Sequence, residues 1–223
     1  FTDTITNGTD TLAIVDFYAE LQGDHYLMQV HIKEPDSSQY MFRFMTTGSG
    51  KFDVWTDSLM GTAGIVKGGL PSAAQMPEII NYELPDSSKI IVSSFQCLSS
   101  TITVGNYVNN STYVDYAGNT NTFPQIVGNI SINSSRGPTR DYRVKPDVVS
   151  PGDPTFAAGI LWIMDILKVS DPVKISPDGW HQRNGGTSLA SPSVAGTGAL
   201  MLEKCPDMNW QDFKDLLTGN AKA

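Results

Sequence analysis

The sequence predicts an α/β region over residues 96–223, preceded by an all-β region over residues 1–95. In the first region, short runs of alternating apolar and polar residues are separated by Gly, Pro, Asp and Ser. Such alternation is typical of strands with one buried face. In the second region, short strand-like segments lead to two segments typical of helices, residues 190–204 and residues 209–217. We therefore expect two parts of different architecture.

The all-β region has several candidate strands. The alternation is clearest from Tyr26 to Lys33, and it returns at Tyr40, Phe42 and Phe44, and at Phe52 and Val54. Turn residues at 34–36, 47–50 and 84–86 separate these runs, and no long helical pattern intervenes. Antiparallel strands that each bury one face are satisfied by a β-sandwich, so we expect a sandwich of the jelly-roll type.

The helical segments follow in the second region. Ala190–Lys204 is expected to be a buried central helix, which Cys205-Pro206 would end. Asn209 and Asp212 have the spacing of a capping box, and the helix behind them would turn Phe213, Leu216 and Leu217 inward. Phe156–Val169 is apolar on several faces and fits either a buried helix or a packing lid.

The most informative segment runs from Gly185 to Gly196 and reads Gly-Gly-Thr-Ser-Leu-Ala-Ser-Pro-Ser-Val-Ala-Gly. Its two glycines lead into Thr187 and Ser188, which open an apolar stretch. This order places a hydroxyl at a helix N-terminus, where free N–H groups and the helix dipole favour developing negative charge. Such a position suits a nucleophilic serine, although an ordinary N-cap serine has the same local pattern.

This segment resembles the nucleophile motif of the subtilases, Gly-Thr-Ser-x-Ala-x-Pro-x-x-Ala-Gly. Seven positions match in order, Gly186, Thr187, Ser188, Ala190, Pro192, Ala195 and Gly196. The resemblance implies that Ser188 is the nucleophile, that its N–H is one oxyanion donor, and that Gly186, Thr187 and Ser188 form the nucleophile loop. One departure is Ser193, where many members carry His.

Two further segments support the resemblance. Residues 134–139, Ser-Ser-Arg-Gly-Pro-Thr, and residues 145–152, Lys-Pro-Asp-Val-Val-Ser-Pro-Gly, are similar to a subtilase stretch, although turns and a short strand explain them equally well. Residues 102–105 are similar to the buried strand that precedes it. The resemblance thus implies the C-terminal half of a subtilisin-like α/β domain, with a parallel sheet and a central helix, over residues 96–223. It also implies that residues 1–95 are most of a jelly-roll insert like that of larger bacterial subtilases, with a last strand at Lys89–Ser94.

The other members of the catalytic triad are not recognisable. The chain has three histidines, His25, His31 and His181, and none follows the family's His-Gly-Thr pattern. The segments that would carry the acid and the oxyanion Asn are also absent, and the chain starts at Phe1. His181, seven residues before Ser188, is a weak substitute, since no orienting carboxylate stands at a telling position. We therefore expect the Asp, the His and the Asn to precede Phe1, and residues 1–223 alone to be inactive.

Composition excludes several classes of function. A net charge of −8 argues against nucleic acid, and the longest apolar run, Phe156–Met164, is too short to span a bilayer. No His/Cys/Asp cluster has metal-site spacing, so we expect no cofactor; a structural calcium, known in many subtilases, cannot be located. Two cysteines, Cys97 and Cys205, exclude a disulfide framework and leave one bridge open. Trp55 and the aromatic stripe suggest core strands, or alternatively a carbohydrate platform.

Two functions remain. The first is a serine endopeptidase that acts on polypeptides, located outside the cell or in the cell envelope of a bacterium by family resemblance. The second is a degenerate subtilase homologue that binds a ligand through the β-sandwich. A lipase or esterase is excluded because the chain lacks a Gly-x-Ser-x-Gly elbow.

Overall fold

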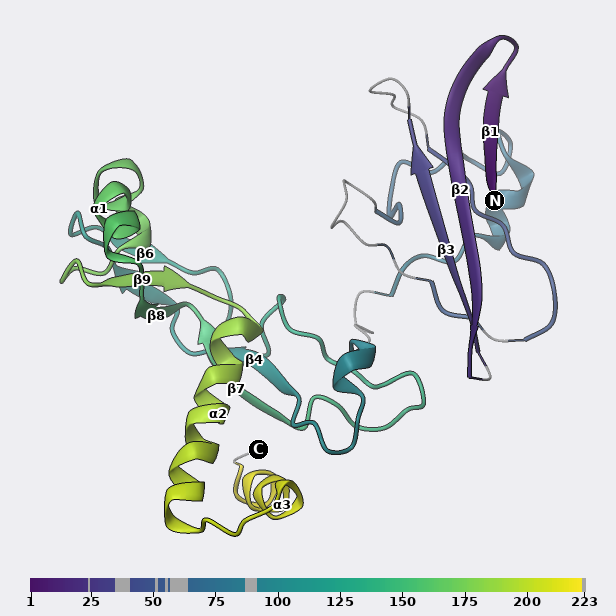
Figure 1. Cartoon of the computed structure of the whole chain (residues 1–223). Coiled ribbons are helices and arrows are strands. Elements are labelled where there is room, and N and C mark those ends of the chain that lie inside the picture. The colour runs from purple at the N-terminus through teal and green to yellow at the C-terminus, as the bar shows by residue number, and fades with distance from the viewer. Residues whose placement is uncertain are drawn as a thin grey trace. The chain divides into compact units, whose positions relative to one another are not determined.

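The computed structural model describes residues 1–23, 25–34, 41–50, 52–54, 56, 64–86 and 92–221. The chain divides into two compact units, residues 1–56 and residues 57–223 (Figure 1). The boundary expected near residue 95 stays a prediction, and each unit is described by itself.

The first unit is built on a three-stranded antiparallel sheet in the order β1-β2-β3. Its strands are β1 (Thr2–Asn7), β2 (Asp10–Gln22) and β3 (His25–Lys33). Gly8 and Gly23 turn the chain between neighbouring strands with φ values of 63° and 64°, which side chains other than glycine adopt at a cost. The predicted strand at Tyr26–Lys33 is thus confirmed as part of β3.

One face of this sheet is apolar. The register places Tyr26, Met28, Val30 and Ile32 of β3 opposite Leu21, Ala19, Phe17 and Val15 of β2, and paired residues share a face. The expectation that this face is buried is wrong for several of them, since Tyr26 is 72% and Met28 49% exposed. A single sheet layer buries little, and among the described residues no second sheet covers these side chains.

The other candidate strands are not found. Residues 41–47 and 52–54 have no strand, and Val92–Ser94 is not a strand either. Extended segments become strands only when a neighbour pairs with their N–H and C=O groups, and no such partner is found in the described ranges. Tyr40, Trp55 and residues 89–91 lie outside the described residues, so the jelly roll and the carbohydrate platform stay predictions.

The second unit contains a short parallel sheet of β4 (Val104–Val108) and β7 (Val148–Asp153). α2 (Thr187–Lys204) packs against both strands. A hairpin of β5 (Thr112–Val114) and β6 (Thr120–Thr122) accompanies them, as does an antiparallel pair of β8 (Thr155–Ala158) and β9 (His181–Asn184). The remaining elements are α1 (Leu161–Ser170), α3 (Trp210–Asn220) and the 3₁₀ turns η1 (Pro77–Asn81), η2 (Ser94–Gln96) and η3 (Pro172–Lys174).

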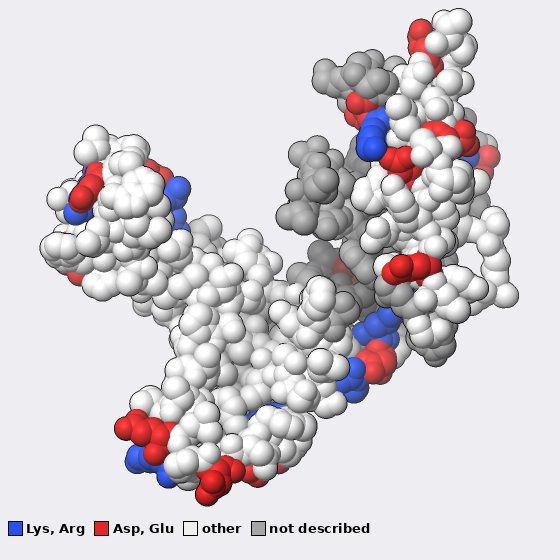
Figure 2. Space-filling model, in the orientation of Figure 1, with Lys and Arg blue, Asp and Glu red and all other residues white. Residues whose placement is uncertain are grey.

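The predicted helices are present but less buried than expected. α2 ends at Lys204, before Cys205-Pro206 as predicted, yet it buries only Ala190, Val194 and Gly198. These three residues recur every fourth position and so lie on one face of the helix. At Gly198 this face lies against the Phe213 ring of α3. Figure 2 shows few charged side chains on the visible face around α2, and Leu200 is 66% exposed. In α3 the capping box is confirmed, whereas Leu216, expected to face inward, is exposed.

Two other expectations are also answered. α1 covers only the later part of Phe156–Val169, because β8 takes residues 155–158, and it buries Met164 alone. Trp162, Ile166 and Val169 lie exposed on the helix, so the alternative of a buried helix is wrong, and the packing lid stays a prediction. Cys97 and Cys205 are both free thiols.

Candidate active site

The nucleophile loop lies at the beginning of α2. Gly186 is the N-cap residue with φ 95°, and the helix begins at Thr187, so Ser188 is its second residue. The N–H groups of Leu189 and Ala190 donate to the Gly186 carbonyl at 3.0 and 3.4 Å and so close the first turn. Ala190 is fully buried, whereas Ser188 is exposed. The serine hydroxyl is therefore presented to solvent from a fixed helix end.

No side chain of the described residues caps this helix. The N–H groups of a helix's first turn have no acceptor within the helix, and together with the helix dipole they favour a nearby anion. The sequence alternative of a serine that caps its own helix does not fit, because Gly186 holds the N-cap position. The loop thus leaves donors available where an oxyanion would form next to Ser188.

A buried carboxylate lies behind the loop. Asp153, the last residue of β7, is 3% exposed and its Oδ1 accepts the Gly186 N–H at 2.9 Å. Its Oδ2 accepts the Asn106 Nδ2–H at 2.5 Å and the Ser131 hydroxyl at 2.6 Å. Asp153 is not among the site residues that the sequence predicted. A carboxylate placed directly after the Pro-Gly turn of a buried strand was the signal that could have found it.

Strand β9, which pairs with β8, leads the chain into the nucleophile loop. Thr155 pairs with Asn184 at the end beside the loop, and Ala158 pairs with His181 at the opposite end. The Arg183 guanidinium lies 5.2 Å from the centre of the Tyr113 ring, and Phe156 meets the same ring edge-on at 5.7 Å. These contacts fix the strand from which Gly185 and Gly186 extend.

His181 has an orienting carboxylate after all. Its Nδ1 lies 3.0 Å from Asp178 Oδ2. The pKa of Asp178 is lowered, first by the hydrogen bond from the Ser176 hydroxyl, then by the Trp180 N–H, with a smaller contribution from His181. The pair lies in a turn at the start of β9, the end away from the nucleophile loop, about 10 Å of strand from Asn184.

A family comparison settles the wider assignment. A model of the subtilase family matches residues 72–223, well over half of the chain. The chain belongs to the subtilase family. The predicted resemblance is confirmed, and the family match supports an α/β fold of the subtilisin type.

Curated subtilases show local similarity. Serine protease AprX of Bacillus subtilis is 35% identical over 86 residues, which cover 38% of this chain and 18% of AprX. Pyrolysin of Pyrococcus furiosus is 35% identical over 103 residues, which cover 45% of this chain and 6% of pyrolysin. No solved structure gives a significant match. The chain thus spans less than a fifth of the length of these relatives.

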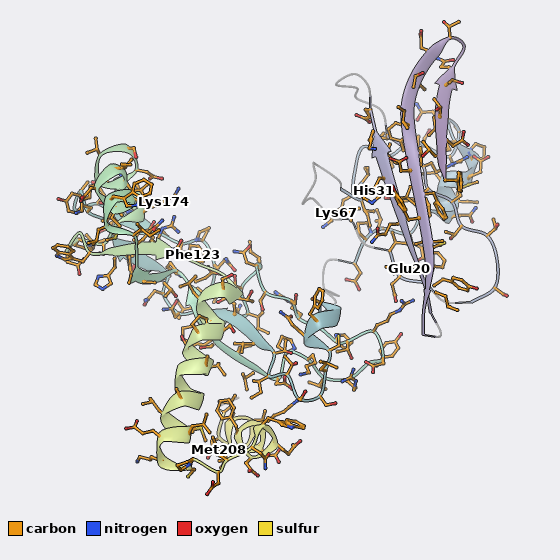
Figure 3. All side chains as sticks on the ribbon, viewed as in Figure 1. Glu20, His31, Lys67, Phe123, Lys174 and Met208 are labelled. Carbon is orange, nitrogen blue, oxygen red and sulfur yellow. The ribbon has the colours of Figure 1, made fainter. Side chains whose placement is uncertain are left out.

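The second unit contains the three residues that the motif assigns to the nucleophile loop. Gly186, Thr187 and Ser188 are adjacent at the start of α2, and His181 is the one histidine in the sequence of residues 57–223. His31 lies on β3 of the first unit (Figure 3), edge-on to Tyr18 at 5.7 Å. The His25 side chain lies outside the described residues.

The described residues contain no group of three or more His, Cys, Asp or Glu placed to hold a metal ion. Within the same residues, no helix has both the length and the apolar character that a membrane crossing requires.

Proposed function

We propose that this chain carries the nucleophile of a subtilisin-like serine endopeptidase. Ser188 Oγ would attack a peptide carbonyl, and a histidine outside this chain would accept the serine proton. The Ser188 N–H and an asparagine outside the chain would donate to the oxyanion. Loss of the amine and attack by water would then complete hydrolysis through an acyl-enzyme. One observation carries the proposal: an exposed Ser188 lies in the first turn of an uncapped helix, within a seven-position family motif.

The missing groups form a second part of the proposal. The base, the acid and the oxyanion amide would come from the rest of the catalytic domain, which makes that region the chain's own partner. The absence of a His-Gly-Thr segment supports this view, as do the small shares of AprX and pyrolysin that the chain covers. Residues 1–223 alone would be inactive, because a serine without its base keeps an alcohol-like pKa.

Covalent labelling tests the proposal. The full-length protein is treated with a fluorophosphonate, and the modified residue is identified by mass spectrometry. Labelling should fall on Ser188 and disappear in Ser188→Ala. Ser191→Ala, which removes an exposed hydroxyl one turn along the same helix, should label normally. Labelling that persists in Ser188→Ala, or a folded full-length protein that never reacts, would refute the enzyme and favour the degenerate homologue.

The first unit and the location of the protein are part of the same proposal. Residues 1–95 would form most of a jelly-roll insert, which the antiparallel β1-β2-β3 sheet and its one apolar face support. The protein would act on polypeptides outside the cell or in a bacterial cell envelope. Fractionation of the source cells would test the location, and recovery only from cytoplasm would contradict it.

A further inference from the structure

Asp153 is an unusual group to find behind a nucleophile loop. Its carboxylate is almost completely buried, and no Lys, Arg or His forms an ion pair with it in the described part of the chain. An ionised carboxylate removed from water is costly unless hydrogen bonds replace its hydration. Asn106, Ser131 and Gly186 supply three such bonds.

Two of these donors hold the carboxylate in place. Asn106 is fully buried in β4, and its backbone N–H donates to Ser134 Oγ at 2.9 Å, which fixes the residue within the sheet. Ser131 is also fully buried, and its hydroxyl donates to Asp153 at 2.6 Å. Both donors bond to Oδ2, so Oδ1 is left to face the loop. The direction of Oδ1 is therefore set by Asn106 and Ser131 and not by the loop.

The third donor is the loop itself. The Gly186 N–H is shared between two acceptors: it donates to Asp153 Oδ1 at 2.9 Å and to the Gly152 carbonyl at 3.1 Å. A Cβ atom added to Gly185 would collide with Asp153 Oδ1. The glycine at 185, outside the seven motif positions, thus lets the loop approach the carboxylate closely.

We propose that Asp153 is a positioning residue for Ser188. The carboxylate, fixed by Asn106 and Ser131, holds the Gly186 N–H and so sets the backbone from which Ser188 and its own N–H project two residues later. The inference rests on the proposed function, because it assigns Asp153 a role for the Ser188 nucleophile. Misplacement of a reacting group by about 1 Å lowers rates by about 100-fold, so loss of this anchor should reduce the rate of Ser188 acylation.

Three variants of the full-length protein test the role. Asp153→Val removes the acceptor with little change in shape. Asn106→Asp places a second carboxylate where the 2.5 Å hydrogen bond now lies. The double variant Asn106→Asp with Asp153→Asn restores a donor and an acceptor between positions 106 and 153. In this double variant, the amide oxygen at position 153 can still accept from the Gly186 N–H, and the amide nitrogen there can donate to the Ser131 hydroxyl.

Two measurements are made on each variant. The first is the rate of fluorophosphonate labelling of Ser188, with kcat and KM for a peptide substrate. The second is hydrogen exchange of the peptide spanning residues 185–189, which needs no activity. We expect Asp153→Val and Asn106→Asp to lower the labelling rate and kcat about 10- to 100-fold, with KM little changed. Hydrogen exchange of residues 185–189 should be faster in both variants. The double variant Asn106→Asp with Asp153→Asn should return kcat to within about threefold of wild type.

The outcomes separate this inference from the proposed function. Normal labelling and normal loop exchange in both single variants would overturn the role of Asp153. If Asp153→Val does not fold, kcat of Asn106→Asp is compared with kcat of the double variant Asn106→Asp with Asp153→Asn. A double variant that does not restore kcat also overturns the role of Asp153. If Ser188→Ala still labels, the proposed function fails, whereas faster loop exchange in Asp153→Val would still show that the carboxylate holds the loop.

Discussion

The imidazole of His181 lies against the carboxylate of Asp178, with 3.0 Å between Nδ1 and Oδ2. The arrangement is that of an oriented histidine, and Ser188 follows only seven residues later. The register of the β8–β9 pair nevertheless places His181 opposite Ala158, at the end of β9 away from the nucleophile loop. A general base must lie within hydrogen-bond reach of the proton that it accepts, so the position of His181 along β9 matters more than its carboxylate partner.

His181→Ala should therefore leave catalysis intact. We expect kcat/KM of the full-length protein to change less than about twofold, whereas loss of a general base costs about 100- to 10,000-fold. Steady-state hydrolysis of a peptide substrate is the measurement. A decrease of about 100-fold or more would identify His181 as the base and contradict the proposal that the base lies outside this chain.

Asp147 should be a major source of stability in the second unit. Its carboxylate lies 2.6 Å from Lys145 Nζ and 2.8 Å from Lys214 Nζ, and its side chain is 6% exposed. Removing one partner of a buried ion pair leaves an uncompensated charge, so Asp147→Asn should lower the free energy of unfolding by about 3 kcal/mol. Asp171→Asn, which breaks the exposed pair with Lys174, should cost less than about 0.5 kcal/mol. Equal effects in chemical denaturation would contradict this difference.

The contribution of Asp147 should depend on pH. Burial alone would raise its pKa, but hydrogen bonds from Lys145 and Lys214 outweigh that effect and lower it. A lowered pKa in the folded state means that the stabilisation is complete above the unfolded-state pKa, about 3.9. It is lost as the pH falls through the folded pKa. The difference between wild type and Asp147→Asn should thus shrink below about pH 4, and a difference that grows there would be inconsistent with the pair.

Gly137 and Gly128 offer a matched pair of backbone substitutions. Both have positive φ, 72° and 88°, but a Cβ on Gly137 would collide with the Lys145 carbonyl, whereas none of the described atoms lies within 4 Å of a Cβ on Gly128. Gly128→Ala should cost about 1 kcal/mol through conformation alone. Gly137→Ala should cost about 2 to 5 kcal/mol, because a backbone group must also move. Thermal unfolding compares them, and similar melting temperatures would contradict the predicted contact.

The capping box of α3 gives a smaller, local effect. Asn209 Oδ1 accepts from the N–H groups of Gln211 and Asp212 at 2.8 and 3.2 Å, and Asp212 Oδ2 accepts from the Asn209 N–H at 3.1 Å. Asn209→Ala should lower stability by about 1 kcal/mol, and Asn209→Asp should retain most of it. Denaturant unfolding of the two variants is the test; an equal loss in both would mean that the cap does not stabilise the helix.

Features set by neighbouring residues were accessible from the sequence. The N-terminus of α2 beside Ser188, its end before Cys205-Pro206, the capping box at Asn209 and the strand at residues 26–33 all depend on residues a few positions apart. The family motif has the same local character, because its matches lie within twelve consecutive residues. Local hydrogen bonding and backbone preference are enough to determine such features.

Tertiary structure alone decided burial and the support of the loop. The donors to Asp153 lie 47, 22 and 33 residues away in the chain, at Asn106, Ser131 and Gly186. No periodicity can predict that these segments meet, because only the pairing of β4 with β7 and the packing of α2 bring them together. The alternation of β3 likewise identified an apolar face but not what covers it, since burial depends on a second layer and not on the strand itself.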